Sequence, residues 1–352
     1  MKKVYINGMG CVSAQDSQSN LFPENILSHT EDNVIYACEP SYKEMIPPAA
    51  ARRMAKGIKM SIAASKKALQ EAEVTSPDAI ITGTGMGCLV DSEKFLRNIL
   101  DNQEQFLTPT AFIQSTHNTV AGQIALDMGC TAYNFTYVNG AVSLASALMD
   151  AQMQLTGEMA QTVLAGGVDE TAPHTIMLYR LINLIKNETI NPDELLKSTT
   201  PGTLWGEGAA FFVLENQPKP ATYATLETVE MQNTLQVEEV HSFIQNSLSA
   251  TGLNPEDIDL VVLGNNGDIN YDTYYDKAAQ LFPQASQVAY KHLSGEFNTA
   301  SGFALWMSLA ILKSRQIPDV IRLNEVVRKP YKTVLLYNQF LGKDHSVIIL
   351  KK

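Results

Sequence analysis

The chain has 352 residues, of which 45% are hydrophobic and 18% charged, and its formal net charge is -11 at pH 7. This length exceeds the size at which one hydrophobic core usually stops growing, so we expect two similar halves or one large layered domain. The composition excludes a disordered or collagen-like chain. The acidic balance argues against nucleic acid or an anionic membrane as the main partner.

No stretch of 18 or more uninterrupted apolar residues occurs, so we expect no insertion into a membrane. The first ten residues lack the long apolar core of a signal peptide, which favours a cytoplasmic protein. The cysteines are Cys11, Cys38, Cys88 and Cys130, with no Cys-x-x-Cys pair and no histidine at metal spacing. The sequence therefore predicts neither a disulfide framework nor a metal site.

Short apolar runs of strand length alternate with longer helical patterns, which is typical of a layered α/β fold. In the first half we expect strands at 4–6, 79–82, 133–138 and 162–165. Helices are expected at 49–73, 120–128 and 142–155. The last of these helices is too apolar for a surface position. A glycine turn at 206–208 leads into one more strand, and the proline-containing segment 218–220 follows as a connector.

The same alternation continues beyond that connector. Helices are expected at 237–251, 272–281 and 302–313, and strands at 260–263, 288–290, 333–337 and 346–350. We therefore divide the chain into halves at 1–217 and 218–352, which together form one compact unit. No direct sequence repeat links them, so a duplicated architecture is inferred from the order of elements alone.

Two local patterns are of kinds that can bind a ligand, but the sequence favours a structural interpretation of each. The glycine-rich turn Gly83–Gly87 follows a strand, but its spacing matches neither phosphate-binding glycine motif and no lysine follows, so we expect no nucleotide cofactor. The basic residues Arg52, Arg53, Lys56 and Lys59 are expected to form the solvated face of a helix.

Several short motifs occur in order along nearly the whole chain. They are Val4–Gly10, Ile81–Gly87, Asn118–Ile124, Leu164–Gly167, Gly206–Ala209 and Asn338–Phe340. Together they resemble the β-ketoacyl-acyl carrier protein synthase (ketosynthase) branch of the thiolase superfamily. The resemblance implies a thiolase-like layered α/β/α/β/α fold with two pseudo-symmetric halves, acyltransferase ancestry and no cofactor.

The run from Asn134 to Gly167 resembles the strand-to-helix turn that carries the catalytic cysteine of this family. Laid without a gap, the family's pattern places Ala141 where the cysteine belongs. A nucleophile there must be a thiolate at a helix N-terminus, beside backbone amides that stabilise an oxyanion. Ala141 supplies the position and none of the chemistry.

The resemblance also locates two assisting histidines. The family's His-Gly-Thr turn corresponds to Leu263–Asp268, where the histidine falls on Gly264, Asn265 or Asn266 depending on one gap. Its Lys-[ST]-x-x-Gly-His motif corresponds to 291–296, with Lys291 kept and Glu296 in the place of histidine. A chain without the Cys-His-His set is not expected to condense acyl groups alone, although it resembles a 3-oxoacyl-acyl carrier protein synthase.

Other residues are expected near the same pocket, and we predict that it is lined by Gly140, Ser143, Lys291, Phe340 and His117. Ser143 could pair with a histidine as a nucleophile, but a capping role on the following helix is the simpler interpretation.

The leading functional hypothesis is a non-condensing subunit similar to a chain-length factor of fatty acid, polyketide or polyene synthesis, closest to the ketosynthase-like proteins of aryl-polyene and flexirubin-type pathways. The resemblance implies an acyl carrier protein and an active ketosynthase as partners. The segments around Asn118 and Thr136 resemble the family's two-fold interface, so a heterodimer and a homodimer are both natural. The alternatives are an enzyme with relocated decarboxylase or thioesterase-like chemistry at Glu296, Asn265 or Asn266, and a module that binds acyl groups or carrier protein without turnover.

Overall fold

The computed structural model describes residues 2–17, 19, 22–23, 26–27 and 30–352. Strands of the first half are β1 (Tyr5–Val12), β3 (Ala79–Gly83), β4 (Tyr133–Tyr137), β5 (Thr162–Asp169) and β7 (Gly208–Glu215). Strands of the second half are β8 (Ala224–Asn233), β9 (Leu260–Leu263), β10 (Ser286–Ala289), β11 (Thr333–Phe340) and β12 (Asp344–Lys351). A separate parallel pair is formed by β2 (Val34–Ile35) and β6 (Trp205–Gly206).

The ten strands form one sheet in the order β10-β9-β11-β12-β8-β1-β7-β5-β3-β4. Each half contributes five strands in the same spatial order and with the same directions. In the first half β3 is parallel to β4 and β5, and β7 is antiparallel to β5 and β1. In the second half β9 is parallel to β10 and β11, and β12 is antiparallel to β11 and β8. The duplicated architecture inferred from element order is therefore confirmed by strand pairing.

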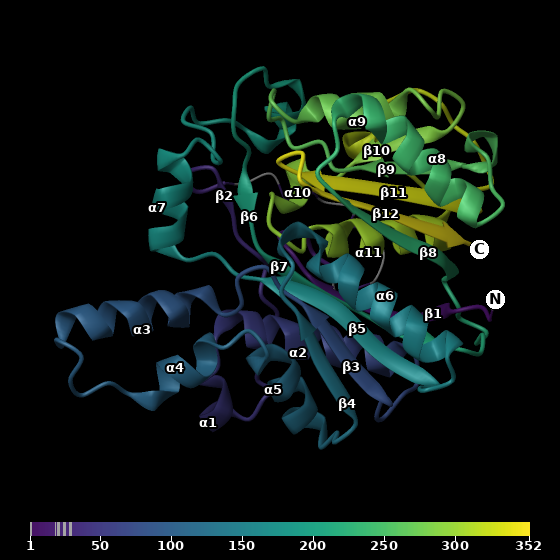
Figure 1. The fold of residues 1–352 in the computed structure, drawn as a ribbon. Coiled ribbons are helices and arrows are strands. Elements are labelled where there is room, and N and C mark those ends of the chain that lie inside the picture. Colours follow the sequence, from purple (N-terminus) through teal and green to yellow (C-terminus); the bar gives the residue numbers. More distant parts are fainter. Residues whose placement is uncertain (1, 18, 20–21, 24–25, 28–29) are drawn as a thin grey trace.

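The two sets of strands meet where β1 pairs with β8, through Tyr5 opposite Thr225 and Ile6 opposite Ala224. Helices lie on both outer faces and between the halves (Figure 1). The outer helices are α2 (Lys56–Glu71), α5 (Thr119–Met128), α8 (Val240–Ala250) and α9 (Asp272–Ala279). The central helices are α6 (Ser143–Thr156), which packs on β3, β5 and β8, and α11 (Ser301–Ser314), which packs on β1, β7 and β11. These layers form the expected α/β/α/β/α arrangement.

Burial of the two central helices accounts for their apolar sequences. Every residue of α11 from Ser301 to Leu312 is buried, and a helix covered on all sides is apolar on all sides. Most of α6 is buried too, which confirms that this apolar helix does not lie on the surface.

The structure corrects several expected elements. The helix predicted at 49–73 is broken into α1 (Pro48–Ala51) and α2, and the long strand β8 was missed. Three further helices were missed: α3 (Leu89–Asp101), α4 (Pro109–Ser115) and α7 (Pro173–Leu181). In α3 only Leu89 is buried, although its apolar residues Leu89, Leu96, Ile99 and Leu100 recur at helical spacing, so the pattern that predicts a helix was present and was overlooked. Two short elements near the site are η1 (Gly140–Val142) and α10 (Lys291–Ser294).

The basic residues near α2 are not a uniformly solvated face. Lys56 is paired with the buried Glu207, and Lys59 lies 3.8 Å from Glu39. Arg52 and Arg53 precede α2 and are exposed. None of the helices in the described part of the chain combines the length and apolar character of a membrane span.

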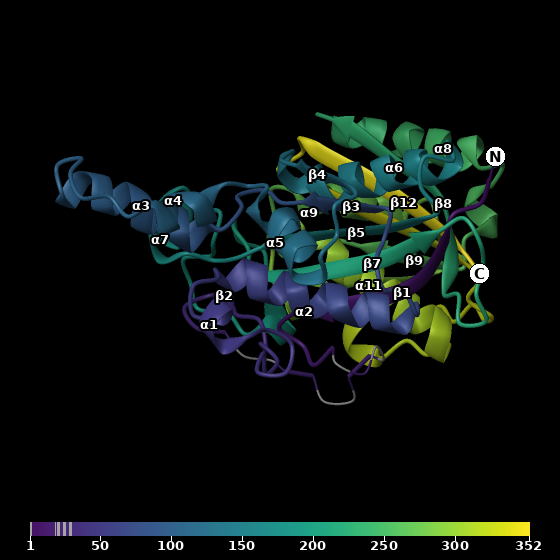
Figure 2. The same cartoon turned by 90° about the horizontal axis from the view of Figure 1, so that it is seen from below.

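Helices α3 and α4, with the residues that connect them, project from the body as an arm (Figures 1 and 2). The arm is tied to the body at Glu170, which is 4% exposed. Its carboxylate accepts hydrogen bonds from the Gly57 N–H at 2.6 Å and the Val90 N–H at 3.0 Å, so it joins the first turns of α2 and α3. Burial raises the pKa of Glu170 to about 7, although both hydrogen bonds act to lower it.

Because the pKa of Glu170 is higher in the folded state, folding favours the protonated acid. The stability that Glu170 contributes is therefore present below pH 4.5 and is lost as pH rises to about 7. Glu170→Gln does not titrate. We expect the unfolding free energy of this variant, relative to wild type, to increase by about 2 kcal/mol between pH 5 and pH 8. Urea unfolding at both pH values measures the change, and parallel pH dependences of the two proteins would contradict it.

Candidate functional site

The turn that follows β4 carries Ala141, where the sequence predicts the position of the family's nucleophile. Ala141 is 1% exposed, in η1 directly before α6. Its backbone N–H donates a hydrogen bond to Asp344 Oδ2 at 3.1 Å. Gly140 has φ +52°, and a Cβ at this position would lie 2.6 Å from the same oxygen. Glycine is favoured here by the backbone conformation, and a Cβ would also displace the Asp344 carboxylate.

Ser143 is the first residue of α6 and is fully buried. Its hydroxyl accepts a hydrogen bond from the Asn139 N–H at 2.8 Å and lies within donating distance of the Thr84 and Gly140 carbonyl oxygens. These contacts hold the turn against the end of β3. None of the hydrogen bonds found among the described residues links this hydroxyl to a histidine, so no Ser-His nucleophilic pair is formed.

Two positions at which the sequence predicts the family's histidines, Asn266 and Glu296, lie together beside a buried ion pair of Glu296 with Lys291. Glu296 is 1% exposed, and its Oε2 lies 2.6 Å from Lys291 Nζ and 2.8 Å from Asn266 Nδ2. Lys291 is fully buried. The backbone of Glu296 is fixed too, because it exchanges hydrogen bonds with Leu204 and Gly206. Hence Lys291, Asn266 and Glu296 form one interlocked cluster.

The structure distinguishes the three residues, 264–266, at which the sequence allows the family's first histidine position. A Cβ on Gly264 would lie 2.6 Å from Asn338 Oδ1 and 2.7 Å from the Tyr275 hydroxyl, so no side chain fits there. Asn266 faces Glu296, as described above. Asn265 has a buried amide oxygen without a hydrogen-bond partner. Asn266 is therefore the residue that occupies the place next to Glu296.

Aromatic side chains enclose the charged pair. Lys291 Nζ lies 5.7 Å from the ring centre of Tyr275 and 5.8 Å from that of Tyr290, within range of cation–π attraction. The Tyr290 hydroxyl donates to Asn338 Oδ1 at 2.9 Å. Burial, with a further contribution from the Glu296 carboxylate, raises the pKa of both tyrosines. Neither phenol can act as an acid near neutral pH.

Two supporting residues had not been predicted from the sequence. Asp272 accepts hydrogen bonds from the Asn266 and Gly267 N–H groups at 3.0 and 2.9 Å, and burial raises its pKa to about 6. The buried Lys186 donates to Gly267 O at 3.0 Å and to oxygens of Ser198 and Thr200. No motif marks either residue, since each is defined only by the tertiary structure.

Two of the predicted lining residues, His117 and Phe340, have other contacts. His117 is exposed, with its side chain beside Gly87. Phe340 ends β11, and its ring packs 6.3 Å from that of Trp205, centre to centre. No hydrogen bond or ring contact among the described residues joins either side chain to Ala141 or Glu296.

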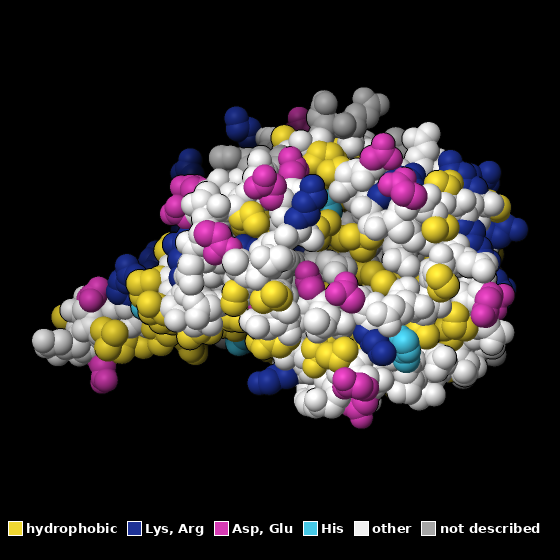
Figure 3. Space-filling model, turned by 90° about the horizontal axis from the view of Figure 1, so that it is seen from above, with side chains coloured by type: hydrophobic (Ala, Val, Ile, Leu, Met, Phe, Trp, Pro, Cys, Tyr) yellow, Lys and Arg dark blue, Asp and Glu magenta, His cyan; other side chains and the backbone are white. Residues whose placement is uncertain are grey.

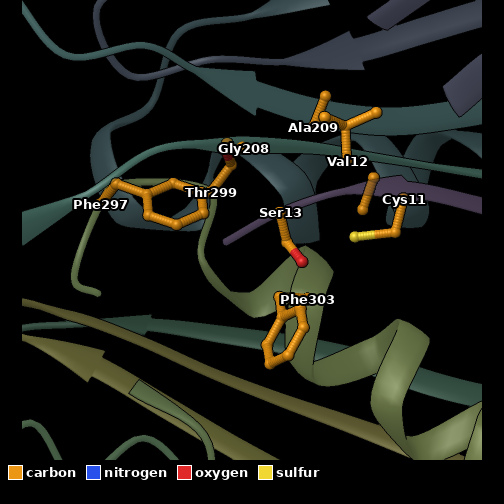
Figure 4. A pocket seen from close by; sticks show the side chains of 9 residues that line it. Cys11, Val12, Ser13, Gly208, Ala209, Phe297, Thr299 and Phe303 are labelled. Carbon is orange, nitrogen blue, oxygen red and sulfur yellow. The ribbon is translucent and has the colours of Figure 1, made fainter. Parts of the chain in front are cut away.

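No buried thiol replaces the missing one. Figure 4 shows a narrow gap between the end of β1 and the rings of Phe297 and Phe303. Cys11 is one of the residues that line it. This gap has no room for a water molecule. Burial raises the pKa of Cys11 to about 12 and also raises that of Cys88, so both thiols stay protonated at neutral pH. Among the described residues, no group of three His, Cys, Asp or Glu side chains is placed to hold a metal ion.

A model of the β-ketoacyl synthase N-terminal domain matches residues 35–219, more than half of the chain. The chain belongs to the β-ketoacyl synthase family. Among curated proteins, none matches it. The ketosynthase fold is also evident from solved structures, which cover the chain from end to end.

The structure described as the ishigamide ketosynthase/chain length factor has 17% identity and a TM-score of 0.84, covering 100% of this chain and 99% of that one. A β-ketoacyl synthase from Burkholderia phymatum STM815 has 16% identity and a TM-score of 0.82, with 100% of each chain covered. A third structure, AntDE:AntF, is described as a type II PKS acyl-carrier protein in complex with its ketosynthase bound to the hexaketide. It has 15% identity and a TM-score of 0.77, with 99% of each chain covered. At these identities the likeness establishes the fold alone.

Proposed function

We propose that this ketosynthase-fold chain is a non-condensing, chain-length-factor-like partner of an active ketosynthase in polyketide or polyene synthesis. The observation that carries the proposal is the set of residues at the Cys-His-His positions. Ala141 has no nucleophilic atom, and the Glu296 carboxylate is bound to both Asn266 and Lys291. Condensation needs a thiolate and two groups that polarise and protonate the substrate, and this site has neither.

Two of the neighbouring structures support the proposed partner classes. One neighbour is described as a ketosynthase/chain length factor and another as an acyl-carrier protein in complex with its ketosynthase. We carry these partner classes over to this chain. An active ketosynthase would supply the chemistry, and an acyl carrier protein would deliver the growing chain.

The pairing surface proposed here is the free edge of the sheet at β4. The opposite edge, β10, is covered by the segment that contains Arg322 and Asn324, through a bridge at Val288 and hydrogen bonds to Gln287. Nothing in the described residues pairs with the outer side of β4. The strand has no proline or lysine to protect it, and an unprotected edge is suited to pairing with another chain.

Apolar side chains extend this surface on both sides of the strand. Around β4 the exposed ones are Leu126, Tyr133, Phe135, Val138 and Met153. The arm adds Leu96, Leu100, Phe106, Phe112 and Ile113, and Figure 3 shows hydrophobic side chains gathered along it. Exposed apolar surface of this extent is typical of an interface. A ketosynthase subunit is the proposed occupant, and a second copy of this chain is the alternative.

A malonyl-carrier assay separates this proposal from relocated chemistry at Glu296. The isolated chain is expected to release carbon dioxide from malonyl-carrier no faster than the uncatalysed background, and Glu296→Ala should give the same rate. Glu296 Oε2 is held by two donors and is not a free base, which is the physical reason. Decarboxylation by wild type that disappears in Glu296→Ala would contradict the proposal and support a decarboxylase.

A further inference from the structure

Asp344 lies over the turn where the nucleophile is missing. It is the first residue of β12 and directly follows the tight connection from β11, in which Leu341 and Gly342 have φ of 54° and 65°. Its backbone is fixed from two sides, because Asp344 is paired with Phe340 of β11 and with Asn233 of β8. Strand pairing therefore directs this carboxylate toward η1.

The contact with the turn is close. Oδ2 of Asp344 accepts the Ala141 N–H at 3.1 Å, across a sequence separation of 203 residues. The same oxygen lies 2.6 Å from the position that a Gly140 Cβ would occupy. The carboxylate oxygen therefore lies against both Gly140 and the Ala141 N–H.

In acyl transfer, the carbonyl oxygen of the thioester becomes negatively charged, and a backbone N–H at the nucleophile stabilises that charge. Here the corresponding N–H already binds an oxygen of the chain itself. A second anionic oxygen at this place would meet both an occupied donor and a like charge, and each opposes its binding.

We propose that Asp344 is a specificity determinant that excludes acyl thioesters from this turn. The inference rests on the proposed function and deepens it, since the chain would then influence a ketosynthase through their shared surface and not by holding an acyl group at Ala141. Loss of the nucleophile and closure by Asp344 are separate features, so restoring the thiol alone would not restore acylation.

Cysteine variants of the isolated chain test this separation. Ala141→Cys places a thiol in the turn with Asp344 still present, and Ala141→Cys/Asp344→Ala removes the carboxylate as well. The neighbouring negative charge disfavours the thiolate, so we expect iodoacetamide to alkylate Cys at 141 about tenfold faster in the double variant. Peptide mass spectrometry gives the rate at each cysteine, and the exposed Cys38 serves as the internal control.

A thioester probe tests acyl exclusion directly. With octanoyl-N-acetylcysteamine, the thiolate at 141 attacks the carbonyl carbon, a new S-octanoyl bond forms and the N-acetylcysteamine thiolate leaves and takes up a proton. The double variant is expected to gain the octanoyl mass and Ala141→Cys is not. Ala141→Cys/Asp344→Asn keeps an acceptor oxygen and the side-chain shape, so it should stay unacylated. This variant is also the control for whether a folding change caused by substituting Asp344 explains acylation of the alanine variant.

Equal alkylation and acylation in Ala141→Cys and in the double variant would overturn the inference. Because no partner protein enters these measurements, they succeed or fail independently of whether the chain binds a ketosynthase.

Discussion

Glu296→Ala is expected to lower the free energy of unfolding by about 3–5 kcal/mol, because it leaves the Lys291 ammonium buried without its counter-ion. Both side chains are at most 1% exposed, and Lys291 Nζ has no carboxylate partner other than Glu296 among the described residues. Asn266 loses its acceptor in the same variant. Urea unfolding monitored by circular dichroism measures the change in midpoint.

Two comparisons isolate the cause. Asp319→Ala removes an acid from an ion pair at the surface, where Asp319 is fully exposed beside Arg322, and should leave stability almost unchanged. Lys291→Met/Glu296→Leu removes both charges and should recover most of the loss, since two apolar groups need no counter-ion. If Glu296→Ala costs no more than Asp319→Ala, the pair does not hold the site together.

Phe135→Asp is expected to weaken association with a ketosynthase partner by about 30-fold or more, as loss of a central aromatic contact typically does. Phe135 is the middle residue of β4, is 45% exposed, and packs beside Tyr133 and Tyr137 on the same face. A carboxylate there would be buried in the proposed interface without a partner. Surface plasmon resonance against the ketosynthase measures the affinity.

Leu323→Asp provides the matched control, because Leu323 is 36% exposed but lies beside the covered edge at β10. It should leave the affinity unchanged. If both variants bind like wild type, the partner does not use the β4 edge. The homodimer alternative is tested by analytical ultracentrifugation of the isolated chain. If two copies pair through β4, Phe135→Asp should convert the dimer into monomers.

The sequence predicted the layers well where burial made the pattern strong. The central helices were found because covered helices are apolar throughout, and the strands on either side were found as short buried runs. The missed α3 differs from the central helices, since only its first residue, Leu89, is buried. Its apolar residues nevertheless recur at helical spacing, so the amphipathic pattern was present in the sequence and was overlooked.

For the site, motif spacing predicts Ala141 and Glu296 as the altered positions, and these assignments stay predictions. The choice of Asn266 needed the space around Gly264, and Asp344 could not be connected with Ala141 by any local pattern, because strand order brings them together across the two halves. Lys186 and Asp272 were missed for the same reason.

Native mass spectrometry of this chain co-expressed with a ketosynthase that has an intact Cys-His-His set tests the central claim most directly. We expect a one-to-one complex that extends malonyl units, in which only the partner's cysteine carries the acyl chain. Recovery of the two proteins as separate species, or an acyl chain attached to this protein, would contradict a non-condensing partner role.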